Sequence, residues 1–275
     1  MSVLAQRVLT AAVLIPLVVA AVLGLSNTLF ASVLAVIFLF AGLEWGHLAD
    51  FQDRLLRMWV LVILALLLAM GYLLHLRKEW MLIVCFIALI YWCVALVWVI
   101  QYEHCGQVSV LEYSSVRFVA GMLTLAPAWI ALVMLHDLSP WLVMYVLLLM
   151  WFADSAAYFA GRRFGQRKLA PKVSPGKSWE GVMGGLLAVA VLATLVSFQM
   201  QMSLAKALGF IALSVAVGMI SVLGDLVESL FKRRAGLKDS GQLLPGHGGL
   251  LDRLDSLMSA APGFALGWLL LESVN

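Results

Sequence analysis

Long apolar stretches that alternate with short polar segments are the feature of this sequence that most restricts its fold. Hydrophobic residues make up 64% of the chain and charged residues only 12%, which leaves too little polar surface for a water-soluble domain. A helix that crosses a membrane needs about 20 apolar residues. Stretches of this kind recur along the chain without the alternating pattern of a membrane β-barrel. We therefore predict an all-α fold, a polytopic transmembrane helical bundle.

The apolar stretches predict about nine membrane spans. No internal repeat, low-complexity tract or soluble segment separates them. We therefore expect one integral-membrane domain over residues 1–275, with amino-terminal helices in 1–135 and a catalytic half in 136–275. The expected spans are 8–25, 28–43, 58–74, 80–100, 118–135, 141–160, 181–198, 207–224 and 257–271.

The basic residues are distributed unevenly, and their distribution predicts how the chain is oriented. The two most basic loops, 161–179 and 225–256, are separated by two predicted spans and must share a face. All but three of the 18 Lys and Arg residues fall on that face, the exceptions being Arg77, Lys78 and Lys206. By the positive-inside rule this face is cytoplasmic, and so is the amino terminus. The net charge of +3 is too small to indicate nucleic acid as a partner.

Acidic residues recur at helical spacing on both sides of the second basic loop. Asp252 and Asp255 stand three residues apart where the last span begins, so both carboxylates project from one helix face. Asp225 and Glu228 repeat this spacing where the eighth span ends. Carboxylate oxygens suit Mg²⁺, which also takes phosphate oxygens of a substrate as ligands. We predict a Mg²⁺ site, with a second cation as a further option. A capping or salt-bridging pair with Arg253 is the alternative that spacing alone leaves open.

The same loop carries glycines and cations that suit a phosphate group. Gly248 and Gly249 let backbone N–H groups approach an anion at the start of the last helix. The neighbouring His247 is either a phosphate ligand or a turn residue. A basic cluster that holds anionic lipid headgroups is the simpler alternative, although it leaves the interleaved acids unexplained. The cations of this loop are Lys232, Arg233, Arg234, Lys238 and Arg253.

One carboxylate, Asp154, lies inside the predicted span 141–160. On insertion scales a carboxylate there costs about 2.5 to 3.5 kcal/mol, so it is normally partnered or functional. We predict that Asp154 contacts the substrate. The alternative is a helix-packing hydrogen bond through Ser155 or Tyr158.

The segment 172–178 follows this span and resembles a phosphate-binding loop. Lys172, Ser174 and Lys177 would supply its cations and a hydroxyl group. The segment lacks the full GxxxxGKS/T spacing after a strand, which excludes a P-loop fold. We predict that these three side chains bind a phosphate group.

Polar residues at other span ends have a simpler interpretation. Glu44 and His47 lie at a predicted membrane boundary, where interfacial anchoring explains both. His75, His104 and His136 also lie at span ends and receive the same interpretation. The chemistry is therefore expected in the two basic loops and in the sixth span.

The stretch 229–255 carries a dense set of motif residues. They are Ser229-x-Phe-Lys-Arg233, Lys238-Asp239, Gly241, Leu244-Pro245 and His247-Gly-Gly-Leu-x-Asp-Arg-Leu-Asp255. This stretch resembles the signature of the phosphatidate cytidylyltransferases along its whole length. The resemblance extends to the loop 174–180 and the segment around Asp154, whereas the amino-terminal half is similar only in its pattern of spans.

The resemblance implies an enzyme that transfers CMP from CTP to phosphatidic acid, giving CDP-diacylglycerol and pyrophosphate. A phosphatidate oxygen would attack the α-phosphorus of CTP directly, assisted by a divalent metal. Asp225, Asp252 and Asp255 would hold Mg²⁺, and Lys238 and Asp239 would act in catalysis. The resemblance also implies a homodimer in the bacterial inner membrane, with membrane lipids around it and the active site facing the cytoplasm.

Two other classes of function remain open. One is another membrane phosphotransferase or nucleotidyltransferase, such as a CDP-alcohol phosphotransferase or a polyprenol kinase, although the D-G-x-x-A-R motif of the former is missing. The other is a secondary transporter that uses the intramembrane carboxylate. Against the transporter, most ionisable residues lie at the predicted cytoplasmic interface.

Overall fold

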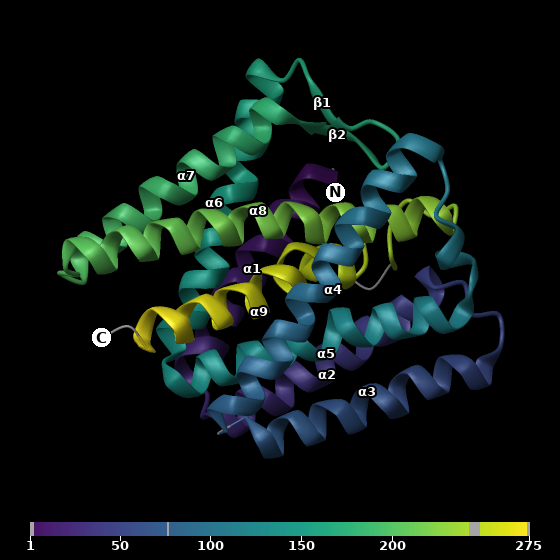
Figure 1. The fold of residues 1–275 in the computed structure, drawn as a ribbon, viewed down its shortest axis with the longest axis horizontal. Helices are drawn as coiled ribbons and strands as arrows, with labels where there is room; N and C mark the ends of the chain where they lie inside the picture. Colours follow the sequence, from purple (N-terminus) through teal and green to yellow (C-terminus); the bar gives the residue numbers. More distant parts are fainter. Residues whose placement is uncertain (1–2, 76, 242–247, 274–275) are drawn as a thin grey trace.

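The computed structural model describes residues 3–75, 77–241 and 248–273, with side chains from residue 12 onward. Within these ranges the chain forms nine α-helices, a short 3₁₀ helix and one two-stranded sheet (Figure 1). The elements are α1 (Val3–Gly24), α2 (Asn27–Leu48), α3 (Arg54–Leu74), α4 (Lys78–Cys105), η1 (Ser109–Glu112), α5 (Ser114–Leu138), α6 (Pro140–Phe164), β1 (Lys168–Ala170), β2 (Ser174–Ser178), α7 (Trp179–Gln199), α8 (Leu204–Arg234) and α9 (Leu251–Ser273).

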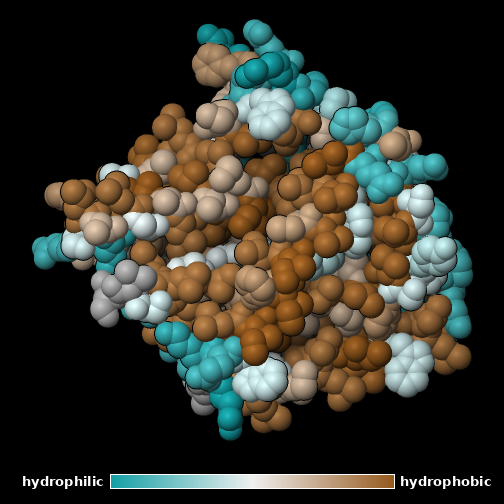
Figure 2. Space-filling model, viewed as in Figure 1, coloured by the Kyte–Doolittle hydropathy of each residue, from teal (hydrophilic) through white to brown (hydrophobic). Residues whose placement is uncertain are grey.

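Eight helices, α2 to α9, are long and apolar enough to cross a membrane in the described part of the chain. Apolar side chains cover much of the outer surface (Figure 2), and large ones such as Leu73, Leu187 and Phe198 are exposed. An apolar surface of this extent is stable only in contact with lipid. The chain is therefore a polytopic helical membrane protein, which confirms the predicted fold class. The described apolar part of α1 is shorter, Ala12–Gly24, so the ninth span stays a prediction.

The central helix of the bundle is α5. Residues along its whole length are buried, from Arg117 near its start to His136 near its end, because α2, α3, α4, α6 and α9 surround it. A buried polar contact joins it to α4, where the hydroxyl groups of Tyr91 and Thr124 lie 2.8 Å apart. Helices α2, α3, α4, α6 and α9 thus pack against one buried core helix.

Successive helices run in opposite directions, so alternate loops meet at one end of the bundle (Figure 1). Arg117 at the start of α5 donates to the carbonyl oxygen of Ala49, which follows α2, at 2.6 Å. The backbone N–H of Lys172 donates to Glu103 near the end of α4 at 3.0 Å. Both expected basic loops therefore lie at this end, and the compartment that it faces stays a prediction. We call it the loop end; its described segments are 49–53, 106–113, 165–178, 235–241 and 248–250.

The second loop is shorter than the sequence predicts, because α8 continues past the expected span end at residue 224. Phe231 is fully buried against the bundle. Lys232 pairs with Glu228, one helical turn earlier, at 2.6 Å. Both contacts stabilise the added turns. Asp225 therefore lies within a helix, where its side chain has a fixed direction.

A short antiparallel hairpin, β1 and β2, links α6 to α7 at the loop end. The sequence predicts no strand here, since β2 contains Pro175 and Gly176 and is too short to show an alternating pattern. Contacts with the start of α7 hold the hairpin instead. The N–H of Trp179 donates to the carbonyl of Arg167 at 2.9 Å, and the Arg167 side chain pairs with Glu180 at 3.2 Å. The all-α prediction misses only this element.

Candidate active site

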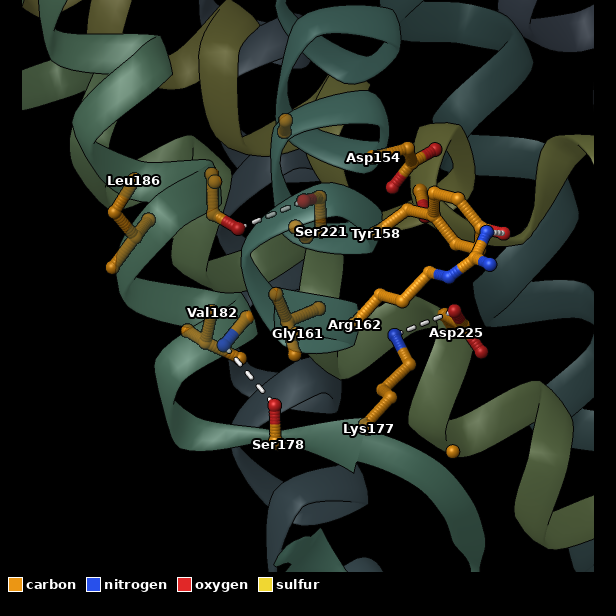
Figure 3. Close-up of a pocket in the computed structure, with 18 residues that line it drawn as sticks. Asp154, Tyr158, Gly161, Arg162, Lys177, Ser178, Val182, Leu186, Ser221 and Asp225 are labelled. Atoms are coloured by element: carbon orange, nitrogen blue, oxygen red, sulfur yellow. Dashed lines mark hydrogen bonds and ion pairs between the residues drawn. The ribbon is translucent and has the colours of Figure 1, made fainter. Parts of the chain in front are cut away.

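A cavity of about 460 Å³ lies near the loop end between α6, the hairpin, α7, α8 and α9 (Figure 3). Small and aliphatic residues of α6, α7 and α8 form one part of its wall, and polar residues form the other. We call it the acidic cavity. Its polar side chains are Asp154, Tyr158, Arg162, Lys177, Ser178, Ser221, Asp225 and Ser256.

Glycines bring α6 and α7 close together beside the acidic cavity. A Cβ atom at Gly185 would lie 2.9 Å from the carbonyl oxygen of Ala153, and a Cβ at Gly181 would lie 3.0 Å from that of Ala157. Larger residues at either position would push the two helices apart. The glycine-rich start of α7 therefore helps to set the shape of the cavity.

The charged part of the cavity is organised around an ion pair between β2 and α8. Lys177 Nζ lies 2.5 Å from Oδ2 of Asp225, and the two side chains are only 25% and 27% exposed. Figure 3 shows Lys177 reaching from the strand toward Asp225. A charge-assisted contact that is partly shielded from water is stronger than a surface pair. The pair thus fixes one cation and one anion on the same wall.

Three residues of α6 complete this wall at successive helical turns. Asp154, Tyr158 and Arg162 project from one helix face (Figure 3). The guanidinium group of Arg162 donates to the Tyr158 hydroxyl at 3.3 Å. The charges of Lys177 and Asp225 act on the Asp154 carboxylate, and so does that of Arg253. Tyr158 and Arg162 were not among the predicted site residues, although their helical spacing from Asp154 is a signal that the sequence contains.

Asp255 lies beside the acidic cavity on the first turns of α9. Its Oδ1 atom accepts the N–H of Ser256 at 2.6 Å. The charges of Asp225, Lys177 and Asp154 all act on its carboxylate. The carboxylates of Asp154, Asp225 and Asp255 therefore interact with the single positive charge of Lys177. An excess of negative charge of this kind attracts a further cation.

Asp252 has different surroundings, because it belongs to a latch between α8 and α9. Lys232 Nζ lies 2.6 Å from Glu228 and 2.7 Å from Oδ1 of Asp252. Oδ2 of Asp252 accepts the N–H groups of Ser240 at 2.9 Å and Gly249 at 2.7 Å. Asp252 is thus bonded at both oxygens and does not line the acidic cavity. We call this group of five residues the α8–α9 latch.

Glu44, near the end of α2, supplies a carboxylate to the start of α9, more than 200 residues later in the sequence. It is buried and accepts the N–H groups of Leu250 at 3.0 Å and Leu251 at 2.8 Å. It also accepts the hydroxyl of Ser240 at 3.1 Å. The interpretation of Glu44 as an interfacial anchor is therefore wrong. A carboxylate at the end of an apolar span was the available signal, but its partners lie too far along the chain to be read from the sequence.

The glycines that were expected to hold phosphate have other partners. Gly248 adopts a φ of +81°, a conformation that favours glycine, and the N–H of Gly249 donates to Asp252. Together with Glu44, the protein's own carboxylates cap this helix start. A phosphate contact at these glycines stays a prediction, and His247 lies outside the described residues.

Other predicted residues lie around the acidic cavity. Lys172 Nζ donates to the carbonyl of His104 at 2.9 Å, and Arg233 Nε donates to the carbonyl of Val173 at 3.2 Å. These contacts tie the hairpin to α4 and α8. The predicted residues that do not line the cavity are Lys172, Ser174, Lys232, Arg233, Lys238, Asp239, Gly248, Gly249, Asp252, Arg253 and Asp255.

The arrangement of carboxylates decides what kind of metal site is possible. Among the described residues, no three His, Cys, Asp or Glu side chains are placed to hold a metal ion together. Mg²⁺ commonly takes only one or two protein carboxylates and completes its shell with water and substrate phosphates. Asp225 and Asp255, whose charges interact, fit this second pattern. The residues present thus fit an ion that binds together with a nucleotide phosphate.

The spans and the charged cavity at their loop end define an integral-membrane protein with a polar site close to the end of its helical bundle. The sequence matches the cytidylyltransferase family over residues 5–271, and the chain belongs to this family. It is 42% identical to the phosphatidate cytidylyltransferase of Haemophilus influenzae, over 95% of this chain and 97% of that protein. It is 40% identical to that of Pseudomonas aeruginosa, over 95% and 96% of the two chains.

Proposed function

We propose that this protein transfers CMP from CTP to phosphatidic acid, producing CDP-diacylglycerol and pyrophosphate. The observation that carries the proposal is the acidic cavity, where a lysine and two carboxylates converge beside an apolar wall. Such a site suits a substrate with phosphate at one end and acyl chains at the other. The two relatives that match nearly the whole chain bear the name of this activity.

The residues of the cavity have complementary parts in this reaction. The phosphate of phosphatidic acid is already ionised at neutral pH, so the reaction depends on positioning and charge neutralisation more than on a general base. Lys177 and Arg162 would bind phosphate oxygens. Asp225 and Asp255 would hold Mg²⁺, which neutralises phosphate charge when bound.

Asp154, which also faces the cavity, would orient the nucleotide or an ion at its phosphates. The apolar side of the cavity, which includes Val182, Leu186 and Val222, would hold the first carbons of the acyl chains. A diacyl substrate could then react without leaving the bilayer.

The surroundings of the protein follow from the same proposal. CTP is a cytosolic solute, so the loop end would face the cytoplasm, as the distribution of basic residues predicts. The membrane would be the bacterial inner membrane, because the relatives are bacterial. A homodimer remains part of the proposal on the resemblance of the sequence alone.

The proposal is tested by measuring pyrophosphate release from CTP by the purified protein in neutral detergent. We expect release only when phosphatidic acid and Mg²⁺ are both present. A CDP-alcohol phosphotransferase would instead release CMP from a CDP-lipid, and a transporter would release neither product. Pyrophosphate release that does not depend on phosphatidic acid would contradict the proposal.

A further inference from the structure

A second cavity, of about 200 Å³, lies at the loop end between the end of α4, η1 and the end of α8. Within the described part of the chain, it shares no lining residue with the acidic cavity. We call it the arginine cavity. The residues that matter for its chemistry are Tyr102, Gly106, Gln107, Glu112, Arg233 and Arg234.

Positive charge predominates around the arginine cavity. Arg233 and Arg234 both line it, and Arg117 lies close enough for its charge to repel that of Arg234. The one acidic residue among the described residues of the lining, Glu112, is 70% exposed and lies 3.6 Å from Arg234. That distance is too long for a good hydrogen bond. A solvated carboxylate at this distance compensates the arginines only weakly.

Arg234 also has a donor without an acceptor. Its side chain is only 17% exposed, and its Nε atom is buried without a hydrogen-bond partner among the described residues. Leaving such a donor unpaired costs about 1 to 3 kcal/mol. A charged guanidinium group satisfies its donors best with the oxygens of a phosphate or carboxylate. Among the described residues, the guanidinium group of Arg234 therefore has only the distant, exposed Glu112 as an anionic partner.

We propose that the arginine cavity binds a phosphate group. The group would be either a small soluble phosphate, such as inorganic phosphate or pyrophosphate, or the phosphodiester headgroup of an anionic lipid at the membrane surface. Arg234 and Arg233 supply the charge, and the volume is sufficient for one phosphate with its hydrating water. Because Arg233 also donates to Val173 in the hairpin, a phosphate bound to Arg233 would also influence the position of the hairpin, which carries Lys177.

The test measures anion binding by isothermal titration calorimetry on the purified full-length protein, with EDTA present. Without a divalent ion the carboxylates of the acidic cavity weaken phosphate binding there, and the binding that is lost in variants of the arginine cavity reports on that cavity. Inorganic phosphate and pyrophosphate are the probes. We expect wild-type protein to bind pyrophosphate, and we expect Arg234→Gln to bind it with an affinity at least about tenfold lower.

Two further variants make the result decisive. Gln107→Glu places a negative charge at an exposed position of the lining, so it should abolish anion binding. This variant keeps both arginines, and it therefore tests the site independently if Arg234→Gln fails to fold. Arg54→Gln removes the same charge from an exposed arginine elsewhere at the loop end and should bind like wild type. Equal binding by wild type, Arg234→Gln and Gln107→Glu would overturn the proposal, as would no anion binding by the wild type in detergent or in lipid.

The source of the phosphate is decided by repeating the titration in lipid nanodiscs. If discs with phosphatidylglycerol suppress pyrophosphate binding, whereas discs of phosphatidylcholine alone do not, the occupant is a lipid headgroup. If binding is the same in both, the occupant is a soluble phosphate. Either result supports the site. Neither depends on turnover of CTP, which is measured with Mg²⁺, so failure here leaves the proposed function intact.

Discussion

At the scale of single residues, the account depends on the ion pair between Lys177 and Asp225. Lys177→Gln and Asp225→Asn should each reduce kcat about 100-fold, because each removes a charge that would neutralise or position phosphate. The double variant should lose little more, since paired groups act as one unit. Lys78→Gln, at an exposed lysine on α4, is the control. Rates within threefold of wild type in either single variant, in a steady-state assay, would remove the pair from the reaction.

Glu44 is a residue whose effect should be structural first and catalytic second. Glu44→Gln leaves the N–H groups of Leu250 and Leu251 with a weaker acceptor, which should cost about 1.5 to 3 kcal/mol of stability. We expect a lower melting temperature in detergent and a lower kcat, because α9 carries Asp255. The exposed neighbour His47, changed to alanine, should alter neither. An unchanged melting temperature in Glu44→Gln would show that the cap contributes nothing.

At the scale of elements, the hairpin holds Lys177 in place only because its far side is tied down. Glu103 on α4 accepts the N–H groups of Lys172 and Val173. Glu103→Gln should loosen this contact, increase tryptic cleavage within 167–177 and lower kcat/KM about tenfold. Glu79→Gln makes the same change at the exposed other end of α4. Cleavage rates that match this control would show that the hairpin does not depend on Glu103.

The packing of α8 against α9 gives Asp252 and Asp255 different surroundings, although their spacing in the sequence suggests the same role for both. Asp252→Asn breaks the α8–α9 latch and leaves Lys232 with one partner, so it should lower the melting temperature by several degrees. Asp255→Asn should keep the melting temperature near that of wild type while abolishing turnover, because its carboxylate lies beside the acidic cavity, where the charges of Asp225 and Lys177 act on it. Thermal unfolding and turnover measured on both proteins decide the matter. The reverse pattern would exchange the roles of the two residues.

At the scale of the whole molecule, hydropathy is sufficient to predict the architecture. A spanning helix must be long and apolar, so α2 to α9 each coincide with a predicted span, although α8 ends at residue 234 and not at 224, and α9 begins at residue 251 and not at 257. The hairpin could not be predicted, since tertiary contacts hold Pro175 and Gly176 in a strand. The extension of α8 was also missed, because the charged residues from Asp225 to Arg234 interrupt the apolar signal of a span.

The site could be predicted only in part, for a related reason. Charged residues in or beside apolar spans are costly, which made Asp154 and Asp225 visible. What spacing cannot show is which neighbour each charge meets. Asp252 and Asp255 have equivalent positions in the sequence, but only the packing of α8 against α9 reveals that one is latched to Lys232. The contact of Glu44 with the start of α9 is equally invisible to any local pattern.

The most direct measurement of the central claim follows the α-phosphorus of CTP. Purified protein is incubated with phosphatidic acid, Mg²⁺ and CTP labelled at the α-phosphate, and the organic phase is analysed for labelled lipid. The account predicts that wild-type protein transfers the label to a lipid product in a phosphatidate-dependent way, and that Asp225→Asn transfers about 100-fold less. Label that stays in water, or that enters lipid equally well with Asp225→Asn, would contradict it.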